Sequence, residues 1–241
     1  MIKIERVVLA SPEQMEFIIE GMRNPLNSWK KSDSHICKMD GSFCMECEHK
    51  NEYCLGKNDY SLMERLAKAG TEHRKYMRMI PVYARITAPI YYWKEADTYK
   101  IGTVSNSCST MHKIQDKEFA LDDFSYEHLI AESREIFVQN DDDYPYFVCS
   151  FEDMLYIQIE ALNKARNLYL ETGDKNYWWQ MIQLLPSSYN QTRNIMFNYE
   201  VLANIYKQRK NHKLDEWREF CNWIETLPYS ELITGKKESQ K

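Results

Sequence analysis

Residues 185–217, LPSSYNQTRNIMFNYEVLANIYKQRKNHKLDEW, hold the pattern on which the fold assignment depends. Polar and apolar side chains recur here at helical spacing, which predicts one long helix over about 192–210. Steps of four, three and four residues keep four side chains on one face of such a helix, namely Asn198, Leu202, Ile205 and Arg209. The stripe therefore begins with an amide and ends with a guanidinium.

A guanidinium on an apolar stripe requires an anionic or carbonyl partner. Glu200 and Glu216 could supply that partner within the chain, which would make Arg209 part of a structural salt bridge. A bound ligand is the other source, and Asn204 would lie about a third of a turn round the helix from this stripe. The residues alone leave both interpretations open.

Helices dominate the rest of the prediction. Residues 2–9 alternate and then become apolar, which predicts a strand, and the SPEQ that follows predicts a capped helix to about Arg23. A β-rich segment is expected at 77–89. Further helices are expected at about 60–70, 90–100, 126–137, 151–172, 176–186 and 214–228.

The helix over 151–172 has the clearest amphipathic pattern. One apolar stripe is formed by Leu155, Ile159, Leu162, Ala165 and Tyr169, and Gly173 is placed to end the helix. Taken together, these segments predict an α+β, helix-dominated fold with a small mixed or antiparallel sheet and long C-terminal helices.

Composition limits the architecture and the partners. The chain has 241 residues with only 7 glycines and 7 prolines, which favours long helices in a single domain over 1–241. Its net charge of −5 makes polymeric nucleic acid an unsuitable partner, because duplex binding requires a basic surface. No signal-peptide pattern and no run of membrane-spanning length are found. We therefore expect a cytoplasmic protein with reduced thiols and no membrane partner.

A cysteine-rich stretch at 35–57 differs from its surroundings, and we interpret it as an insertion within the domain. Four cysteines have the spacing C-x6-C-x2-C-x6-C, namely Cys37, Cys44, Cys47 and Cys54. Four thiolates can converge on one tetrahedral ion, which predicts a structural zinc site, and an iron–sulfur cluster would suit the same ligands. Four unligated thiols or one redox pair are the alternatives, and His35 and His49 are nearby substitute ligands.

Residues 98–112, TYKIGTVSNSCSTMH, are rich in hydroxyl side chains and contain one glycine. From composition alone, such a segment caps a helix end. The alternative is that it holds a small polar ligand.

Two blocks of the sequence together resemble the flavin-dependent thymidylate synthases. The first block keeps the family's helix entry at Ala88-Pro89-Ile90. The second block keeps the family's register at Leu185-Pro186, Asn198, Asn204, Arg209 and Trp217. The resemblance covers roughly residues 60–235 and implies a fold like that of the thymidylate-synthase-complementing proteins.

The signature of that family, R-H-R-x7-S, is degenerate in this chain. The R-H-R segment, which grips the flavin, falls on Thr98-Tyr99-Lys100, so one positive charge is kept without the bidentate geometry of arginine. The signature serine falls on Cys108. Glu95 replaces a nucleotide-contacting glutamine, and Ile182 replaces a phosphate-binding arginine, although Arg193 follows close by.

The resemblance implies an FAD-dependent methyltransferase that modifies C5 of dUMP or a related pyrimidine nucleotide, with methylenetetrahydrofolate as carbon donor and NADPH as reductant. It also implies a homotetramer. Arg209 would polarise the pyrimidine ring as the catalytic residue. The flavin-binding positions would be Tyr99, Lys100, Thr103, Asn106, Asn198 and Asn204. The nucleotide-binding positions would be Glu95, Ser107, Ser109, Thr110 and Arg193.

A non-catalytic protein on the same scaffold is the alternative. Such a protein would bind a nucleotide or a partner and would use the cysteine-rich metal site as a docking surface. The lost signature arginines distinguish this alternative from an enzyme.

Overall fold

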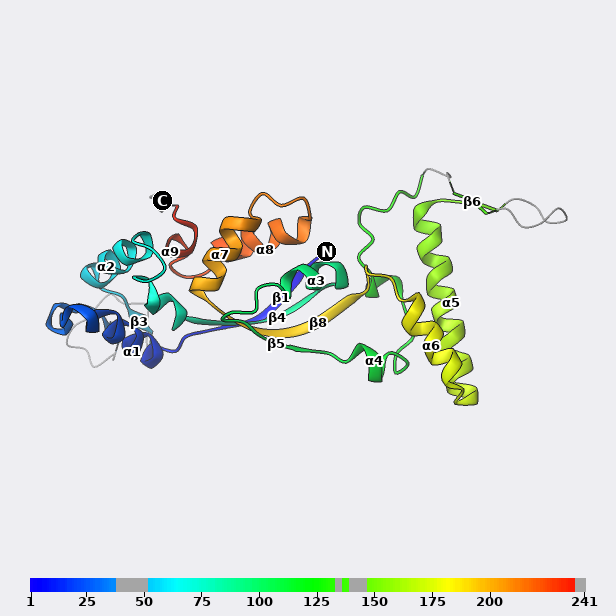
Figure 1. The fold of residues 1–241 in the computed structure, drawn as a ribbon, viewed down its shortest axis with the longest axis horizontal. Helices are drawn as coiled ribbons and strands as arrows, with labels where there is room; N and C mark the ends of the chain where they lie inside the picture. Colours follow the sequence, from blue (N-terminus) through cyan, green and yellow to red (C-terminus); the bar gives the residue numbers. More distant parts are fainter. Residues whose placement is uncertain (38–51, 133–135, 139–146, 237–241) are drawn as a thin grey trace. The chain divides into compact units, whose positions relative to one another are not determined.

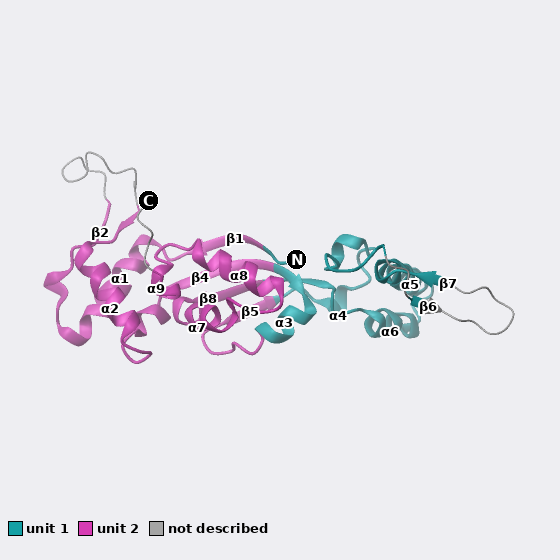
Figure 2. Ribbon diagram, turned by 90° about the horizontal axis from the view of Figure 1, so that it is seen from above, with its two compact units in different colours: residues 1–3, 87–96, 107–193 teal, residues 4–86, 97–106, 194–241 magenta. Residues whose placement is uncertain are grey.

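The computed structural model describes residues 1–37, 52–132, 136–138 and 147–236, and the statements below concern these residues. The chain divides into two compact units (Figure 2). Unit 1 comprises residues 1–3, 87–96 and 107–193, and unit 2 comprises residues 4–86, 97–106 and 194–241. The prediction of a single domain with an insertion over 35–57 stays a prediction.

A four-stranded sheet has the strand order β1-β4-β8-β5 (Figure 1). Its strands are β1 (Lys3–Leu9), β4 (Pro81–Pro89), β5 (Val104–Ser107) and β8 (Asn190–Asn198). Alternation decides which side chains of β4 are covered, because Val82, Ala84 and Ile86 are buried whereas Tyr83 between them is exposed. The predicted strand at 2–9 and β-rich segment at 77–89 correspond to β1 and β4.

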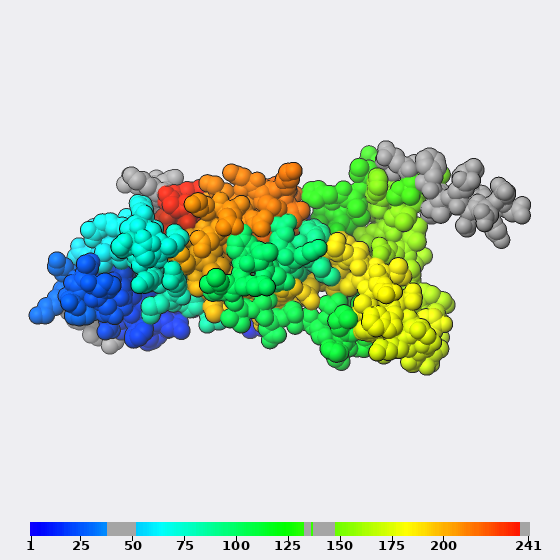
Figure 3. Space-filling view, viewed as in Figure 1, coloured from blue at the N-terminus to red at the C-terminus, as the bar shows by residue number. Residues whose placement is uncertain are grey.

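Unit 2 contains most of the short helices. They are α1 (Pro12–Arg23), α2 (Lys57–Lys68), α7 (Tyr199–Arg209), α8 (Asp215–Glu225) and α9 (Glu231–Thr234), with 3-10 turns η1 (Asn24–Leu26), η2 (Trp29–Lys31) and η3 (Lys75–Arg78). The predicted capping box of α1 is present, with Ser11 accepting from the Gln14 N–H. Helix α9 packs on α2 and α7, and Figure 3 shows the cyan surface of α2 meeting the red C-terminal surface.

Unit 1 is built on the pair of helices α5 (Phe151–Thr172) and α6 (Lys175–Leu184). The predicted stripe forms its core, because Leu155, Ile159, Leu162 and Ala165 of α5 are all buried. Gly173 ends α5 in the left-handed region, at φ 67°. The unit also holds α3 (Ile90–Ala96), α4 (Thr110–Lys113), η4 (Leu121–Asp123) and the antiparallel pair β6 (Ile136–Val138) and β7 (Phe147–Cys149).

Two sequence predictions about helices are wrong. The expected helix over 192–210 is strand β8 followed by α7, because Ile195 and Phe197 are buried on one face of a strand and Asn198 then caps the helix. The expected helix near 126–137 is also wrong, because residues 126–132 form turns and bends and 136–138 form a strand. In addition, α3 ends at Ala96 rather than extending to residue 100.

Among the described residues, no helix has both the length and the apolar character needed to cross a membrane. The predicted cysteine-rich insertion is described only at its two ends. There, β2 (His35–Ile36) pairs antiparallel with β3 (Tyr53–Cys54), and the Cys37 N–H donates to the Glu52 carbonyl at 2.9 Å.

A buried ion pair anchors the base of this ribbon. The carboxylate of Asp59 accepts from Arg23 Nε at 2.5 Å, and both side chains are at most 4% exposed. The hydroxyls of Ser32 and Ser34 and the backbone N–H groups of Asp33 and Ser34 donate to the second carboxylate oxygen. Burial alone would raise the pKa of Asp59, but the hydrogen bonds from Ser34, Ser32 and Arg23 lower it below its ordinary value.

Replacing Asp59 should strongly destabilise unit 2. In Asp59→Ala, the Arg23 charge is left buried without its partner, and we expect a loss of about 3–5 kcal/mol in the free energy of unfolding at pH 7. Because the folded pKa is lowered, this stabilisation is present at neutral pH. It should disappear as the pH falls below about 4 and through the folded pKa.

Urea unfolding at several pH values measures both effects. Asp116→Ala is the matched control, because that aspartate is exposed in a surface pair with Lys113, and its cost should stay below about 1 kcal/mol. Equal costs for the two variants would show that the buried pair does not stabilise the ribbon base.

Candidate functional site

Asn198 marks the change from strand β8 to helix α7, and its side chain links two segments of unit 2. Its Oδ1 accepts from the Val201 N–H at 2.9 Å, which caps the helix. Its Nδ2 donates to the Gly102 carbonyl at 3.4 Å. The side chain is buried, so its amide holds the segment around Gly102 against the N-terminus of α7.

Gly102 is required at this approach for two reasons. Its φ of 83° lies in the left-handed region, which side chains other than that of glycine rarely adopt. A Cβ atom at this position would lie 2.7 Å from Asn198 Nδ2 and 2.9 Å from Val201 Cγ2. The turn is also closed internally, because the Thr103 hydroxyl donates to the Tyr99 carbonyl.

Tyr99 brings the same segment to the C-terminal end of α7. Its hydroxyl accepts from Arg209 Nε at 2.9 Å and donates to Gln208 Oε1 at 2.9 Å. Its ring meets the buried Trp217 ring edge-on, with centroids 5.8 Å apart. The polar segment and helix α7, which the sequence placed together only by resemblance, are therefore in direct contact.

Arg209 is half-buried among aromatic rings. Its guanidinium carbon lies 4.9 Å from the Trp217 ring centroid and 5.7 Å from that of Tyr99. Its Nη1 lies 2.9 Å from His212 Nε2. These contacts fix the plane of the guanidinium. The nearby Cys221 thiol stays protonated at neutral pH, because burial raises its pKa to about 11.

Asn204 lies on another side of α7, in a charged cluster. Its Oδ1 accepts from Arg74 Nη2 at 3.4 Å, and Arg74 Nε pairs with Glu200 Oε2 at 2.7 Å. Glu200, one of the acidic partners considered for Arg209, thus pairs with Arg74.

Two predicted flavin-binding residues are exposed to solvent. Lys100 precedes Ile101, whose side chain is 92% exposed, and Asn106 follows Val104, which is 61% exposed. Residues 100–106 therefore present a cation and an amide beside apolar side chains.

The predicted nucleotide-binding residues all belong to unit 1, where Gln191 connects two of them. Gln191 Nε2 donates to Thr110 Oγ1 at 2.9 Å, and its Oε1 accepts from Arg193 Nε at 2.9 Å. The Arg193 guanidinium lies over the Trp93 ring, 4.4 Å from its centroid, and Trp93 Nε1 donates to the Gln191 carbonyl. Thr110 and Arg193 are thereby brought together.

The other predicted nucleotide-binding residues, Ser109, Ser107 and Glu95, are not part of the contacts around Gln191 described above. Ser109 is exposed and caps α4 by accepting from the His112 N–H at 3.1 Å. Ser107 ends β5 and is exposed, and Glu95 is half-buried on α3.

Several connecting residues were not identified from the sequence, namely Trp93, Gly102, Gln191, Gln208 and His212. Gln191 and Arg193 are two residues apart, a spacing that places both on one face of a strand. This two-residue spacing did not identify Gln191 as a partner of Arg193, because the segment was expected to form a helix and not a strand.

The predicted four-cysteine site is tested only in part. Cys44 and Cys47 lie outside the described residues, whereas Cys37 and Cys54 lie at the two ends of the β2–β3 ribbon. The register of the ribbon pairs Cys54 with His35. Because Cys37 follows His35 by two residues, Cys37 and Cys54 lie diagonally across the ribbon on the same face. Within the described part of the chain, no group of three or more potential metal ligands is found.

Comparison with known proteins identifies the fold. No family model and no curated protein sequence matches the chain. Among solved structures, thymidylate synthase X from Helicobacter pylori, in complex with FAD and dUMP, is similar with a TM-score of 0.59 and 16% identity. The likeness covers 97% of this chain and 95% of that one.

A second similar structure is the UMP/dUMP methylase PolB from Streptomyces cacaoi, bound to 5-bromo-UMP. It has a TM-score of 0.57 and 13% identity, over 98% of this chain and 95% of the other. The chain therefore has the α+β fold of flavin-dependent thymidylate synthases, as the sequence resemblance implied.

The close approach at Gly102 leads to a stability prediction. In Gly102→Ala, the added methyl group meets Asn198 and Val201, and we expect a loss of about 2–4 kcal/mol in the free energy of unfolding. Thermal unfolding followed by circular dichroism provides the measurement.

Gly235→Ala is the matched control. Gly235 also has a positive φ, of 70°, but no atom lies within 4 Å of its added Cβ. It should lose only about 1–2 kcal/mol, the cost of the left-handed backbone. Equal losses in both variants would show that the contact between Gly102 and α7 is not close in solution.

Proposed function

We propose that this chain is a flavin-dependent enzyme that modifies C5 of a pyrimidine nucleotide, with dUMP or UMP as the substrate class. The observation that carries the proposal is the setting of Arg209, a half-buried guanidinium oriented by Tyr99, His212 and the Trp217 ring. It lies in a fold shared with a thymidylate synthase and a UMP/dUMP methylase.

The residues around this site fit FAD in their chemistry. The segment 100–106 exposes Ile101 and Val104 beside Lys100 and Asn106, which suits a cofactor that joins an apolar ring system to phosphates. When bound, the reduced flavin would supply the hydride for the reaction. Lys100 and Asn106 would bind the cofactor, and Tyr99, Thr103, Asn198 and Asn204 would shape the surface on which it lies.

Arg209 would act on the nucleotide itself. A guanidinium whose plane is already fixed can donate to a pyrimidine carbonyl without reorganising, and it would stabilise negative charge that develops on the ring. Trp217 and Tyr99 cover the guanidinium and reduce its exposure to water, which strengthens that interaction.

The remaining roles follow the resemblance. In unit 1, Arg193 and Thr110, joined through Gln191, would bind the nucleotide phosphate, with Ser107, Ser109 and Glu95 nearby in sequence. Methylenetetrahydrofolate would supply the carbon unit and NADPH would reduce the flavin. The active form would be a cytoplasmic homotetramer.

One observation favours a non-catalytic nucleotide-binding protein instead. Asn198 and Thr103, two of the predicted flavin contacts, form hydrogen bonds within the chain, and the flavin-gripping arginines of the signature are absent. In that case the scaffold would be kept while turnover is lost.

Flavin binding and turnover test the proposal directly. The purified protein should be yellow. If it is purified without the cofactor, added FAD should raise the melting temperature of the protein, and the fluorescence of FAD should be quenched on binding. Because substitution at C5 expels the hydrogen of C5, dUMP or UMP tritiated there should release tritium to water. Arg209→Gln should slow this release by about 100-fold or more.

Lys207→Gln is the matched control, since it removes an equal charge from an exposed position on α7. It should leave the rate within about twofold of wild type. A colourless protein that shows neither a thermal shift nor quenching with FAD would contradict the enzymatic function.

For the cysteine-rich insertion, we propose a structural zinc or iron–sulfur site formed by Cys37, Cys44, Cys47 and Cys54. Elemental analysis of freshly purified protein should find about one zinc ion, or the iron of one cluster, per chain. Cys37→Ser should lower this amount at least twofold, because a four-thiolate site loses one ligand.

Cys108→Ser provides the control, because that cysteine is exposed and lies outside the insertion. Its metal content should equal that of wild type. Metal-free wild-type protein after purification without chelators would contradict the four-thiolate site.

A further inference from the structure

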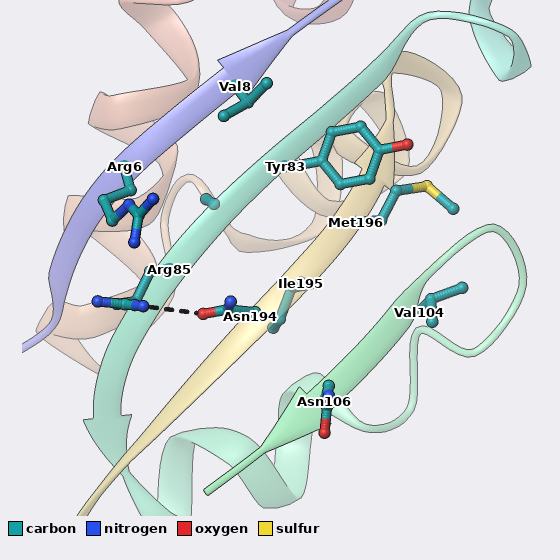
Figure 4. Close-up of a pocket in the computed structure, with 10 residues that line it drawn as sticks. Arg6, Val8, Tyr83, Arg85, Val104, Asn106, Asn194, Ile195 and Met196 are labelled. Atoms are coloured by element: carbon teal, nitrogen blue, oxygen red, sulfur yellow. Dashed lines mark hydrogen bonds between the residues drawn. The ribbon is translucent and has the colours of Figure 1, made fainter.

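Two pockets in unit 2 differ in the charge of their walls. The pocket in Figure 4 lies on the sheet and is lined by Arg6 and Arg85, and Arg85 Nε donates to Asn194 Oδ1 at 3.3 Å. Because Asn106, one of the proposed flavin contacts, also lines it, this pocket belongs with the proposed cofactor surface. A second pocket, of about 390 Å³, has no lysine or arginine among the described residues that line it, and Glu52 is the charged residue of its wall.

Tyrosines from three separate segments line the second pocket, which we call the tyrosine pocket. Tyr53 belongs to β3, Tyr199 begins α7, and Tyr229 lies in the turn between α8 and α9. Apolar side chains, among them Met15 of α1 and Ile80, contribute to the rest of the wall. The lining is therefore aromatic and apolar, with one carboxylate.

Contacts within the chain fix the turn that carries Tyr229. The Tyr199 hydroxyl donates to the Pro228 carbonyl at 2.5 Å. On another side, the Tyr229 ring lies 6.4 Å from the ring of Tyr60, centroid to centroid, and the Tyr60 hydroxyl donates to Glu231. The tyrosine pocket is therefore formed before any ligand binds, as small-molecule sites usually are.

The backbone of Tyr229 supports a binding role. Its φ of 54° lies in the left-handed region, which bulky side chains rarely adopt. Strain of this kind persists only where the surrounding structure holds it, and it is concentrated at catalytic and ligand-binding positions.

Negative groups surround the tyrosines. Burial raises the pKa of Tyr229 above its ordinary value, and Cys54, Glu231 and Glu52 raise it further. Burial also raises the pKa of Tyr53 to about 12. Both side chains are therefore neutral phenols at physiological pH, and the carboxylates that disfavour their ionisation would favour a cation in the tyrosine pocket.

We propose that the tyrosine pocket binds an alkylated ammonium ion, that is, a small organic cation whose nitrogen carries methyl groups. The cation would lie against the rings of Tyr53, Tyr199 and Tyr229, because the face of an aromatic ring attracts positive charge. Glu52 would provide the opposite charge.

The apolar part of the wall favours a methylated nitrogen over a primary ammonium group. A primary ammonium group is strongly hydrated and needs several acceptors to replace its water. The hydroxyl of Tyr199 already donates to Pro228, and side chains such as Met15 and Ile80 accept no hydrogen bond of this kind. Methyl groups on the nitrogen would instead pack against these side chains.

This inference does not depend on the proposed function. The tyrosine pocket shares no residue with the proposed flavin, nucleotide and catalytic positions. A protein that fails to bind FAD could therefore still bind the cation, and failure to bind the cation would leave the proposed enzyme untouched.

Choline and its uncharged isostere, in which carbon replaces the quaternary nitrogen, provide the test. The two molecules have nearly the same shape, and each gives one sharp methyl signal, so ligand-observed NMR titration of the full chain measures both dissociation constants. Choline should bind about tenfold or more tightly than the isostere. Ethanolamine, which has the same charge without methyl groups, should bind about tenfold more weakly than choline.

Variants of two residues connect the preference for the cation to the tyrosine pocket. Tyr229→Leu keeps an apolar side chain but removes the ring, and it should weaken choline binding about tenfold while the isostere stays within about twofold. Tyr229→Phe keeps the ring and should bind choline within about twofold of wild type. Glu52→Gln removes the charge and should weaken choline binding about threefold or more.

Glu20→Gln is the control, because Glu20 is exposed on α1 and lies outside the tyrosine pocket. It should keep both dissociation constants within about twofold of wild type.

Three outcomes would overturn the proposal. The first is that choline binds no more tightly than its isostere, or does not bind. The second is that ethanolamine binds as tightly as choline. The third is that Tyr229→Leu and Glu52→Gln both leave the preference for choline unchanged, because the cation would then bind elsewhere. If Tyr229→Leu does not fold, Glu52→Gln alone decides the third outcome.

Discussion

The amide of Asn198 is the interaction on which the candidate site depends. A single side chain ends strand β8, caps helix α7 and holds the carbonyl of Gly102. Because Gly102 approaches so closely, the segment that contains it follows α7 along its length, and Tyr99 reaches Arg209 at the other end. The amide of Asn198 fixes the segment at the N-terminus of α7, and Tyr99 fixes it at the C-terminal end.

This arrangement explains how a degenerate signature can be compatible with an intact fold. By the resemblance, the R-H-R segment falls on Thr98, Tyr99 and Lys100, and Tyr99, at the histidine position, supports Arg209.

Local sequence signals predicted much of the fold. The capping box at Ser11, the stripe from Leu155 to Ala165 and the stop at Gly173 each depend on neighbours within one helix, and all three are confirmed. The long helix over 192–210 failed because helical and strand spacing can coincide over a few residues. Asn198 was expected on the face of a helix, whereas it ends strand β8 and caps helix α7. The site depends on contacts such as Gln191 with Thr110, 81 residues apart, which no local pattern contains.

A crystal structure of the protein with FAD and either dUMP or UMP tests the central claim most directly. The account predicts a pyrimidine carbonyl oxygen about 3 Å from the Arg209 guanidinium, with Tyr99 and Trp217 in their present places around it. Nucleotide density that lies away from Arg209, or a guanidinium that contacts only protein atoms in the liganded crystal, would contradict it.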